Sequence, residues 1–131
     1  MKFVFDENFA PNLARALALL DNEHEVASVV DKYGRGLDDI DWIPRLADED
    51  ENWVILTIDK RISRNKKITE VWKQAGLTTF FFVGAWAHTS SWDRIVKTIG
   101  LWKNIVEKAC QAKRGSVFKV LIKSKEIVEL K

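Results

Sequence analysis

The alternation of apolar and polar segments along the chain predicts four buried strands. Each apolar segment is short, rich in β-branched or aromatic residues and closed by polar residues, which is typical of strands rather than helices. The four segments are residues 3–5, 25–30, 53–58 and 78–83. Strands that lack a polar face are typical of parallel sheets, because such sheets are covered on both sides. The pattern therefore indicates a mainly parallel sheet.

Between these strands, apolar residues recur at intervals of three and four residues and predict helices. The first helix follows Pro11, the second follows Asp38, the third covers residues 68–75, and the longest runs from Trp92 to about residue 113. We expect the apolar faces of these helices to pack on the sheet, with most of their tryptophans in the core.

The C-terminal residues 116–122 and 127–130 have the pattern of a β-hairpin. Strands and helices alternate up to that point, which indicates an α/β protein of three layers, α/β/α, with a mainly parallel central sheet. A chain of 131 residues has the size of one domain, so we expect residues 1–131 to form a single domain.

Composition limits the class of protein further. No apolar run approaches the roughly 20 residues that span a bilayer, and Asp6 and Glu7 come too early for a secretory signal. The single cysteine, Cys110, excludes an internal disulfide, and we expect it on the inward face of the longest helix. These features predict a cytoplasmic protein.

The net charge of +2 hides a strong asymmetry. Residues 1–59 carry 14 acids and 5 bases, whereas residues 60–131 carry 5 acids and 16 bases. Such a division indicates separate acidic and basic surfaces, although two solvated faces that attract each other would show it too. We expect the acids at 48–51 and the lysines of the last helix and hairpin to be solvated surface.

Several acids fall where the predicted strands end. Asp6 follows the first strand and Asp59 the third, and Asp38, Asp39 and Asp41 begin the helix that leads into the third strand. Ligand sites of open parallel sheets form beyond the carboxyl ends of the strands. Carboxylates that crowd together repel one another, so a cation is needed, and oxygen ligands suit Mg²⁺ or Mn²⁺.

Each acid also has an ordinary structural explanation. Asp6 alone reads as a turn residue, and acids at a helix start are explained by capping; the spacing of Asp38 and Asp41 resembles a capping box, as does that of Ser90 and Asp93. Asp59 is harder to explain in this way because it directly follows an apolar strand. The convergence of three segments on one edge is what favours a metal site.

A basic loop over residues 60–67 follows Asp59 directly. Basic residues beside a carboxylate centre suit a phosphate backbone. Arg61 and Arg64 are the candidate RNA-binding residues, whereas Lys66 and Lys67 are expected to be solvated. Trp86, in the loop after the fourth strand, either stacks on a base or is buried.

These motifs, taken together, resemble the PIN-like domain families related to VapC-type toxins of type II toxin–antitoxin systems. The resemblance is carried by the opening Phe-Val-Phe-Asp-Glu-Asn at 3–8, by Asp-Ile-Asp-Trp-Ile-Pro at 39–44 and by Leu-Thr-Ile-Asp-Lys-Arg-Ile at 56–62. The stretch at 76–82 and Trp86 also fit, so the resemblance covers most of the chain in the same order.

The resemblance implies a metal-dependent endoribonuclease, the toxin of such a pair, with RNA as substrate and a cognate antitoxin as partner. It implies that Asp6, Asp39 and Asp59 hold Mg²⁺ or Mn²⁺ as catalytic and metal-binding residues, and that Asp41 is a secondary catalytic acid. A homodimer is compatible with this reading. The family carries a further acid later in the chain, but the fourth strand runs Phe-Phe-Val-Gly-Ala without one, and Asp93 is explained by capping.

Two alternatives stay open. The absent fourth acid would suit a PIN-like binding module that has lost catalysis and acts through a protein partner. A receiver domain would instead bind Mg²⁺ at Asp6 and Glu7 and accept phosphate on Asp59. Its usual lysine after a fifth parallel strand is not recognisable, because the terminal strands are expected to form a hairpin.

Overall fold

The computed structural model describes residues 1–58 and 66–130. Its strands form one six-stranded sheet in the order β2-β1-β3-β4-β5-β6. The strands are β1 (Lys2–Phe5), β2 (Glu25–Ser28), β3 (Trp53–Ile58), β4 (Thr78–Val83), β5 (Val117–Leu121) and β6 (Ile127–Leu130). All neighbours are parallel except β5 and β6, which pair antiparallel. The mainly parallel sheet and the C-terminal hairpin are thus confirmed.

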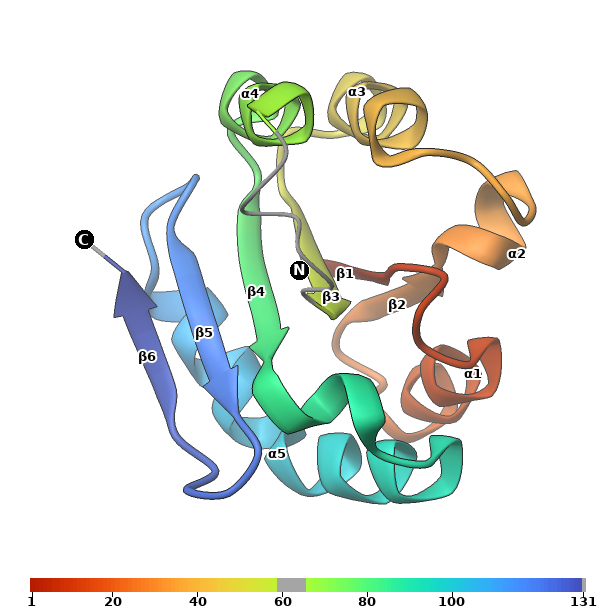
Figure 1. The fold of residues 1–131 in the computed structure, drawn as a ribbon, viewed down its shortest axis with the longest axis vertical. Coiled ribbons are helices and arrows are strands. Elements are labelled where there is room, and N and C mark those ends of the chain that lie inside the picture. The colour runs from red at the N-terminus through yellow and green to blue at the C-terminus, as the bar shows by residue number, and fades with distance from the viewer. Residues whose placement is uncertain (59–65, 131) are drawn as a thin grey trace.

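Helices cover both faces of this sheet, giving the expected three layers (Figure 1). The helices are α1 (Pro11–Leu20), α2 (Val29–Tyr33), α3 (Asp39–Glu49), α4 (Lys66–Ala75) and α5 (Ser91–Gln111), with a 3₁₀ helix, η2, over Gly84–His88. In Figure 1, α1 and α5 lie on one side of the sheet and α3 and α4 on the other. None of the helices in the described ranges has both the length and the hydropathy needed to cross a membrane.

Alternate residues of the strands supply two cores, one on each face. Phe3 and Phe5 of β1 pack with residues of α1 and α5, whereas Val4 between them packs with residues of α3 and α4. All three side chains are fully buried. A strand with two apolar faces has no solvent-facing side, which is why the central strands read as continuous apolar runs.

The order of the strands creates a switch point between β1 and β3. The chain leaves β1 for β2 on one side and returns through α3 to β3 on the other side of β1. Residues that follow β1 and β3 therefore share one edge of the sheet, the place where open α/β sheets form ligand sites. We call this end of the sheet the carboxyl edge, and the opposite end the amino edge.

Several local predictions are wrong. The second strand ends at Ser28 and not at residue 30, because the Ser28 hydroxyl accepts a hydrogen bond from the Val30 amide and begins α2 there. Cys110 is exposed rather than inward, and the Trp92 side chain is 74% exposed although the other helical tryptophans are buried. Strand β5 is also a fifth parallel strand, paired with β4, and not only half of a hairpin.

Candidate functional site

Asp6 stands at the carboxyl edge, one residue beyond β1. Its backbone amide donates to the Leu56 carbonyl at 3.0 Å, which extends the pairing of β1 with β3. The side chain is only 4% exposed. It is held from two sides: the Thr57 hydroxyl donates to Oδ2, and Asn8 donates its backbone amide to Oδ1 (3.1 Å) and its side-chain amide to Oδ2 (3.2 Å). Asp6 is thus a turn residue, but a buried one.

Burial raises the pKa of the Asp6 carboxyl from 3.8 to about 7. Removal from water disfavours the charged form; the donors on Thr57 and Asn8 oppose this effect, and the negative charge of Asp39 adds to it. Three of the roughly four acceptor positions of a carboxylate are used by these donors. The charge of Asp39 acts on Asp6, so the two carboxyls lie near each other. Burial favours the protonated form of Asp6, and a bound cation would favour the charged form.

Asp39 is the first residue of α3 and comes to the same edge from a different part of the chain. The Trp42 indole N–H donates to its Oδ1 at 2.9 Å. Burial raises the pKa of this carboxyl, the Trp42 donor opposes the shift, and the charges of Asp38 and Glu7 add to it. Its Oδ2 has no hydrogen-bond partner within the described residues. Two neighbouring carboxylates with raised pKa values are the main feature of the site.

The loop before α3 is tied to the turn after β1. Glu7 is exposed, but its Oε2 accepts a hydrogen bond from the Gly36 amide at 3.1 Å. Gly36 has a φ of +81°, a conformation that side chains disfavour. This contact joins the segments that carry Asp6 and Asp39.

The other predicted acids of this helix contribute less. Asp38 occupies the N-cap position of α3, but its side chain accepts no hydrogen bond, so the capping box expected with Asp41 does not form. Both side chains are exposed. Ser90, in contrast, caps α5 as expected by accepting from the Asp93 amide at 3.2 Å. Side-chain capping therefore does not explain these acids, although Asp39 and Asp41 lie in the first turn of α3, where the helix dipole favours acids.

Asp59, Arg61 and Arg64 lie outside the described residues. Ile58, which precedes Asp59 in the sequence, is the last residue of β3 and is fully buried. Within the described ranges, no three His, Cys, Asp or Glu side chains form a group that could hold a metal ion. The described part of the candidate site is therefore the pair formed by Asp6 and Asp39.

Arg94 of α5 is a residue of this region that the sequence did not reveal. Its guanidinium donates to the Asn8 carbonyl at 2.9 Å, to the Trp86 carbonyl at 3.2 and 3.0 Å, and to the Thr89 carbonyl at 3.0 Å. It therefore fastens the turn after β1 to η2 and to the start of α5. Its partners are backbone groups, one of them 86 positions away, and such contacts leave no trace in a sequence pattern.

Trp86 is fully buried in the core between the sheet and α5. It packs edge to face on Phe82, with ring centroids 4.9 Å apart. The alternative that this ring stacks on a base is therefore wrong for the present arrangement, and the residue belongs to the core.

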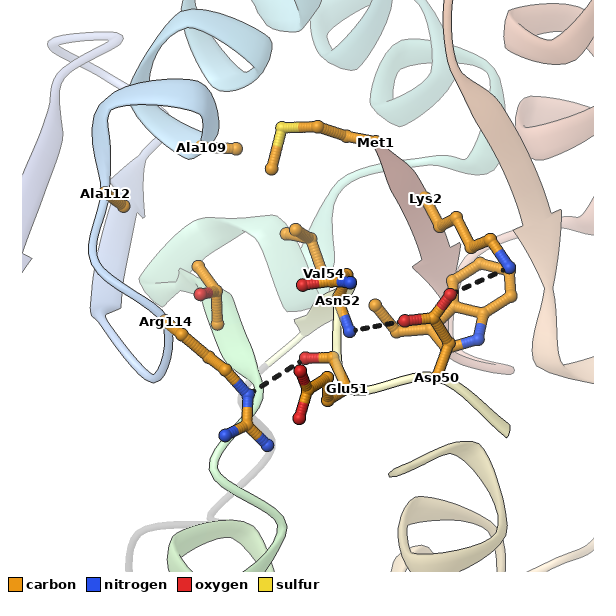
Figure 2. A pocket seen from close by; sticks show the side chains of 11 residues that line it. Met1, Lys2, Asp50, Glu51, Asn52, Val54, Ala109, Ala112 and Arg114 are labelled. Atoms are coloured by element: carbon orange, nitrogen blue, oxygen red, sulfur yellow. Dashed lines mark hydrogen bonds and ion pairs between the residues drawn. The ribbon is translucent and has the colours of Figure 1, made fainter. Parts of the chain in front are cut away.

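A pocket of about 430 Å³ lies at the amino edge (Figure 2). Its charged groups are largely satisfied: Lys2 pairs with Asp50 at 3.0 Å, and Arg114 donates to the Glu51 carbonyl at 3.0 Å. Asp50 also accepts from the Asn52 amide at 2.8 Å. Polar groups that already have partners offer a ligand little, so the pocket does not compete with the carboxyl edge as the candidate site.

Comparison with known families decides what kind of domain this is. A family model described as a PIN-like domain matches residues 1–84 of the 131. The chain belongs to the PIN-like domain family. The matched span includes every residue proposed above for metal or RNA binding, whereas α5 and the terminal hairpin lie outside it. Domains of this family are typically nucleases and generally use divalent metal ions. No curated protein and no solved structure matches the chain.

Proposed function

We propose that this PIN-like domain is a metal-dependent endoribonuclease whose Mg²⁺ or Mn²⁺ is held by Asp6, Asp39 and Asp59. The observation that carries the proposal is the pair of neighbouring acids at the carboxyl edge, Asp6 and Asp39, whose pKa values burial raises. Such a pair is costly without a cation, and hard divalent ions prefer carboxylate oxygens. The donor set therefore fits the metal that the family generally uses.

The chain's own residues would orient this centre. Thr57 and Asn8 fix both oxygens of Asp6, and the Trp42 indole fixes Asp39, so each carboxylate keeps an acceptor position for an ion. A divalent ion held by these residues would polarise the scissile phosphate of the RNA and activate a water molecule. Arg61 and Arg64, shortly after Asp59 in the sequence, would hold the RNA backbone, and Asp41 would act as a secondary acid.

The direct test replaces Asp59 by Asn and measures cleavage of single-stranded RNA with Mn²⁺. We expect the variant to fold and to lose cleavage, because an amide carries no charge to hold the ion. Asp48→Asn, an exposed acid of α3, is the matched control and should cut as well as the unaltered chain. Full activity of Asp59→Asn would contradict the assignment of Asp59 as a metal ligand.

We further propose that the nuclease is the toxin of a type II toxin–antitoxin pair, acting in the cytoplasm and held inactive by an antitoxin. An antitoxin that covers the carboxyl edge could insert an arginine between the acids, because those carboxylates have no cationic partner in the described ranges. The adjacent reading frame tests this: a small DNA-binding protein encoded there supports the pair. Loss of cell growth on expression of this chain alone, rescued by co-expression of that neighbour, is the expected result.

A PIN-like binding module without catalysis is the second candidate. It is favoured by one observation, the absence of an acid along β4 and η2, from Thr78 to His88. Titration with Mn²⁺ separates the two functions, because a module that has lost its metal would show no binding near millimolar ion. The receiver-domain alternative is set aside, because the chain belongs to the PIN-like domain family.

A further inference from the structure

The turn after β1, which carries Asp6, is held by both helical layers. From one layer, the loop before α3 donates the Gly36 amide to the Glu7 carboxylate at 3.1 Å. From the other layer, Arg94 of α5 donates to the Asn8 carbonyl at 2.9 Å. Since α3 and α5 cover opposite faces of the sheet (Figure 1), the loop and the start of α5 approach this turn from two sides.

Arg35 belongs to this loop, and its guanidinium has no polar partner among the described residues. Its side chain is exposed. The backbone around it is fixed, because the Gly34 amide donates to the Val30 carbonyl at 2.9 Å and the Gly36 amide donates to Glu7. Gly34 and Gly36 have φ values of +91° and +81°, which glycine adopts most readily. A fixed loop thus presents an arginine whose charge has no partner in the described fold.

An arginine presented in this way suits a phosphate group. Its five N–H donors form a planar fork that matches phosphate oxygens, and it stays charged at every physiological pH. Acids are near, since Glu7 contacts the residue after Arg35 and Asp38 follows three positions later, yet neither pairs with it in the part of the chain that the structure describes. A phosphate of the RNA backbone would supply the anion, next to the turn that carries Asp6.

Trp92, in the first turn of α5, is 74% exposed. Within the described ranges no other aromatic residue is exposed, and the Trp92 ring contacts no other aromatic ring there. Ser90 caps the helix through its hydroxyl, so α5 does not need an indole at this position. Unpaired bases of RNA stack on exposed aromatic rings. Trp86, the tryptophan expected to stack, is buried, and Trp92 is the ring that the fold leaves open near this edge.

We propose that Arg35 and Trp92 bind the RNA substrate on the two sides of the turn that carries Asp6, Arg35 through a backbone phosphate and Trp92 through a stacked base. The inference rests on the proposed nuclease function and adds two substrate-binding residues to its site. It narrows the substrate to RNA with an unpaired nucleotide near the cleaved bond, since a base stacked on a side chain has left its duplex. Trp92 lies beyond the residues that the family model matches, so the family match does not assign this contact.

The first experiment tests the stacked base with matched variants of protein and RNA. Cleavage of a single-stranded RNA, with Mn²⁺ in excess, gives KM and kcat. Trp92→Leu should raise KM about tenfold and leave kcat nearly unchanged, which is the loss expected for one stacked base. In a series of RNAs that each lack one base, one abasic RNA should raise the KM of the unaltered chain by the same factor. That RNA should not raise the KM of Trp92→Leu further, because the stacking partner is already absent.

The second experiment tests the phosphate contact. Arg35→Met should raise KM about tenfold, and the slope of log KM against log salt concentration should fall by about one, because one phosphate contact is lost. A methylphosphonate at one position of the RNA, which removes the charge of a single phosphate, should have the same effect on the unaltered chain and none on Arg35→Met. Trp92→Leu should keep the salt slope, since a stacked base releases no counterion.

Leu19→Ala and Lys108→Met are the matched controls. Leu19 is 83% exposed near the end of α1, and Lys108 is exposed in the last turn of α5. Both controls should keep the KM of the unaltered chain, and all four variants should keep its circular dichroism spectrum. If the unaltered chain cleaves RNA but Trp92→Leu or Arg35→Met keeps its KM, the inference is overturned and the proposed nuclease function stands. If the unaltered chain cleaves no RNA, the proposed nuclease function itself fails, and the inference fails with it.

Discussion

Both edges of the sheet carry acidic residues, but the pKa values of these acids are shifted in opposite directions. At the amino edge, the Asn52 amide and Lys2 lower the pKa of Asp50, and on the same side of the fold Tyr33 and Lys32 lower that of Glu49. At the carboxyl edge, burial raises the pKa values of Asp6 and Asp39. The difference lies first in burial, which is the main cause of the raised pKa values of Asp6 and Asp39. It lies second in the partners, because Asp50 and Glu49 each have a lysine beside their neutral donors.

This comparison separates acids that form ion pairs from acids that are candidates for a functional site. The acids at 48–51 were expected to be solvated, but Glu49 and Asp50 form ion pairs with Lys32 and Lys2 at 2.9 and 3.0 Å. These ion pairs explain part of the excess of acids in residues 1–59, and no bound ligand is needed for that part. Asp6 and Asp39 lack such compensation among the described residues, and perturbed carboxyls of this kind mark candidate sites.

The largest effect is expected on catalysis. Asp6→Asn should reduce RNA cleavage about a thousandfold, because a bound metal ion contributes several kcal/mol to the transition state and each factor of ten is worth 1.36 kcal/mol. Asp50→Asn, the same change at the amino edge, should leave the rate unaltered. Rates from a fluorescent RNA, measured with Mn²⁺ in excess, provide the check. An equal loss of RNA cleavage in both variants would contradict the claim that only the carboxyl edge takes part in catalysis.

The metal-free protein should lose stability as the pH rises. The pKa of Asp6 is about 7 in the folded chain, and 3.8 is the ordinary value that applies in the unfolded chain. Between these two pH values the folded state therefore binds a proton that the unfolded state has released. The free energy of unfolding should fall by at most about 4 kcal/mol between pH 4 and pH 8. Urea unfolding with a chelator measures this, and Asp6→Asn should flatten the dependence of the unfolding free energy on pH.

Asp50 should show the opposite pH dependence, since its stabilising contribution is lost only as the pH falls below about 4. An unfolding free energy of the unaltered chain that rises from pH 4 to pH 8 would contradict the assignment of Asp6.

Arg94 should matter for stability rather than for chemistry. Arg94→Met removes the donors to three backbone carbonyls and should cost about 2–3 kcal/mol, since hydrogen bonds to charged groups are each worth more than neutral ones. Chemical denaturation gives the value. Lys97→Met, an exposed position of the same helix, is the matched control and should change little. Equal stability of the two variants would mean that Arg94 does not fasten the turn after β1.

The smallest effect is expected at the ion pair of the amino edge. Lys2→Met should lower the urea midpoint only slightly, because exposed ion pairs contribute little. The difference from the unaltered chain should vanish at about 1 M salt, where screening acts within about 3 Å. A large loss that salt does not remove would show that the pair of Lys2 and Asp50 is more than an ordinary exposed ion pair.

Most of the fold could be predicted from the sequence, because long apolar runs and helical spacing report burial directly. The strands at 53–58 and 78–83 are found with the predicted bounds. The local choice between strand and helix was harder to predict. Val29 and Val30 favour a strand, but Ser28 caps a helix that begins there. Trp92 continues the helical spacing of α5 and is nevertheless exposed.

The site could be predicted in part. That Asp6 and Asp39 meet follows from the parallel order of the strands, which brings different segments to one edge. The sequence could not show which acids have a partner that offsets their charge. Such partners come from distant segments, as in the ion pair of Lys2 with Asp50 and the hydrogen bond from Gly36 to Glu7. Asp59, Arg61 and Arg64 remain sequence predictions, because they lie outside the described residues.

Calorimetric titration with Mn²⁺ tests the central claim most directly. The unaltered chain and Asp50→Asn should bind the ion below millimolar concentration and release protons at pH 7, because binding displaces the proton that burial favours on Asp6. Asp6→Asn should bind at least tenfold more weakly and release fewer protons. Binding of equal strength in all three proteins, or no binding in the unaltered chain, would contradict a metal centre at the carboxyl edge.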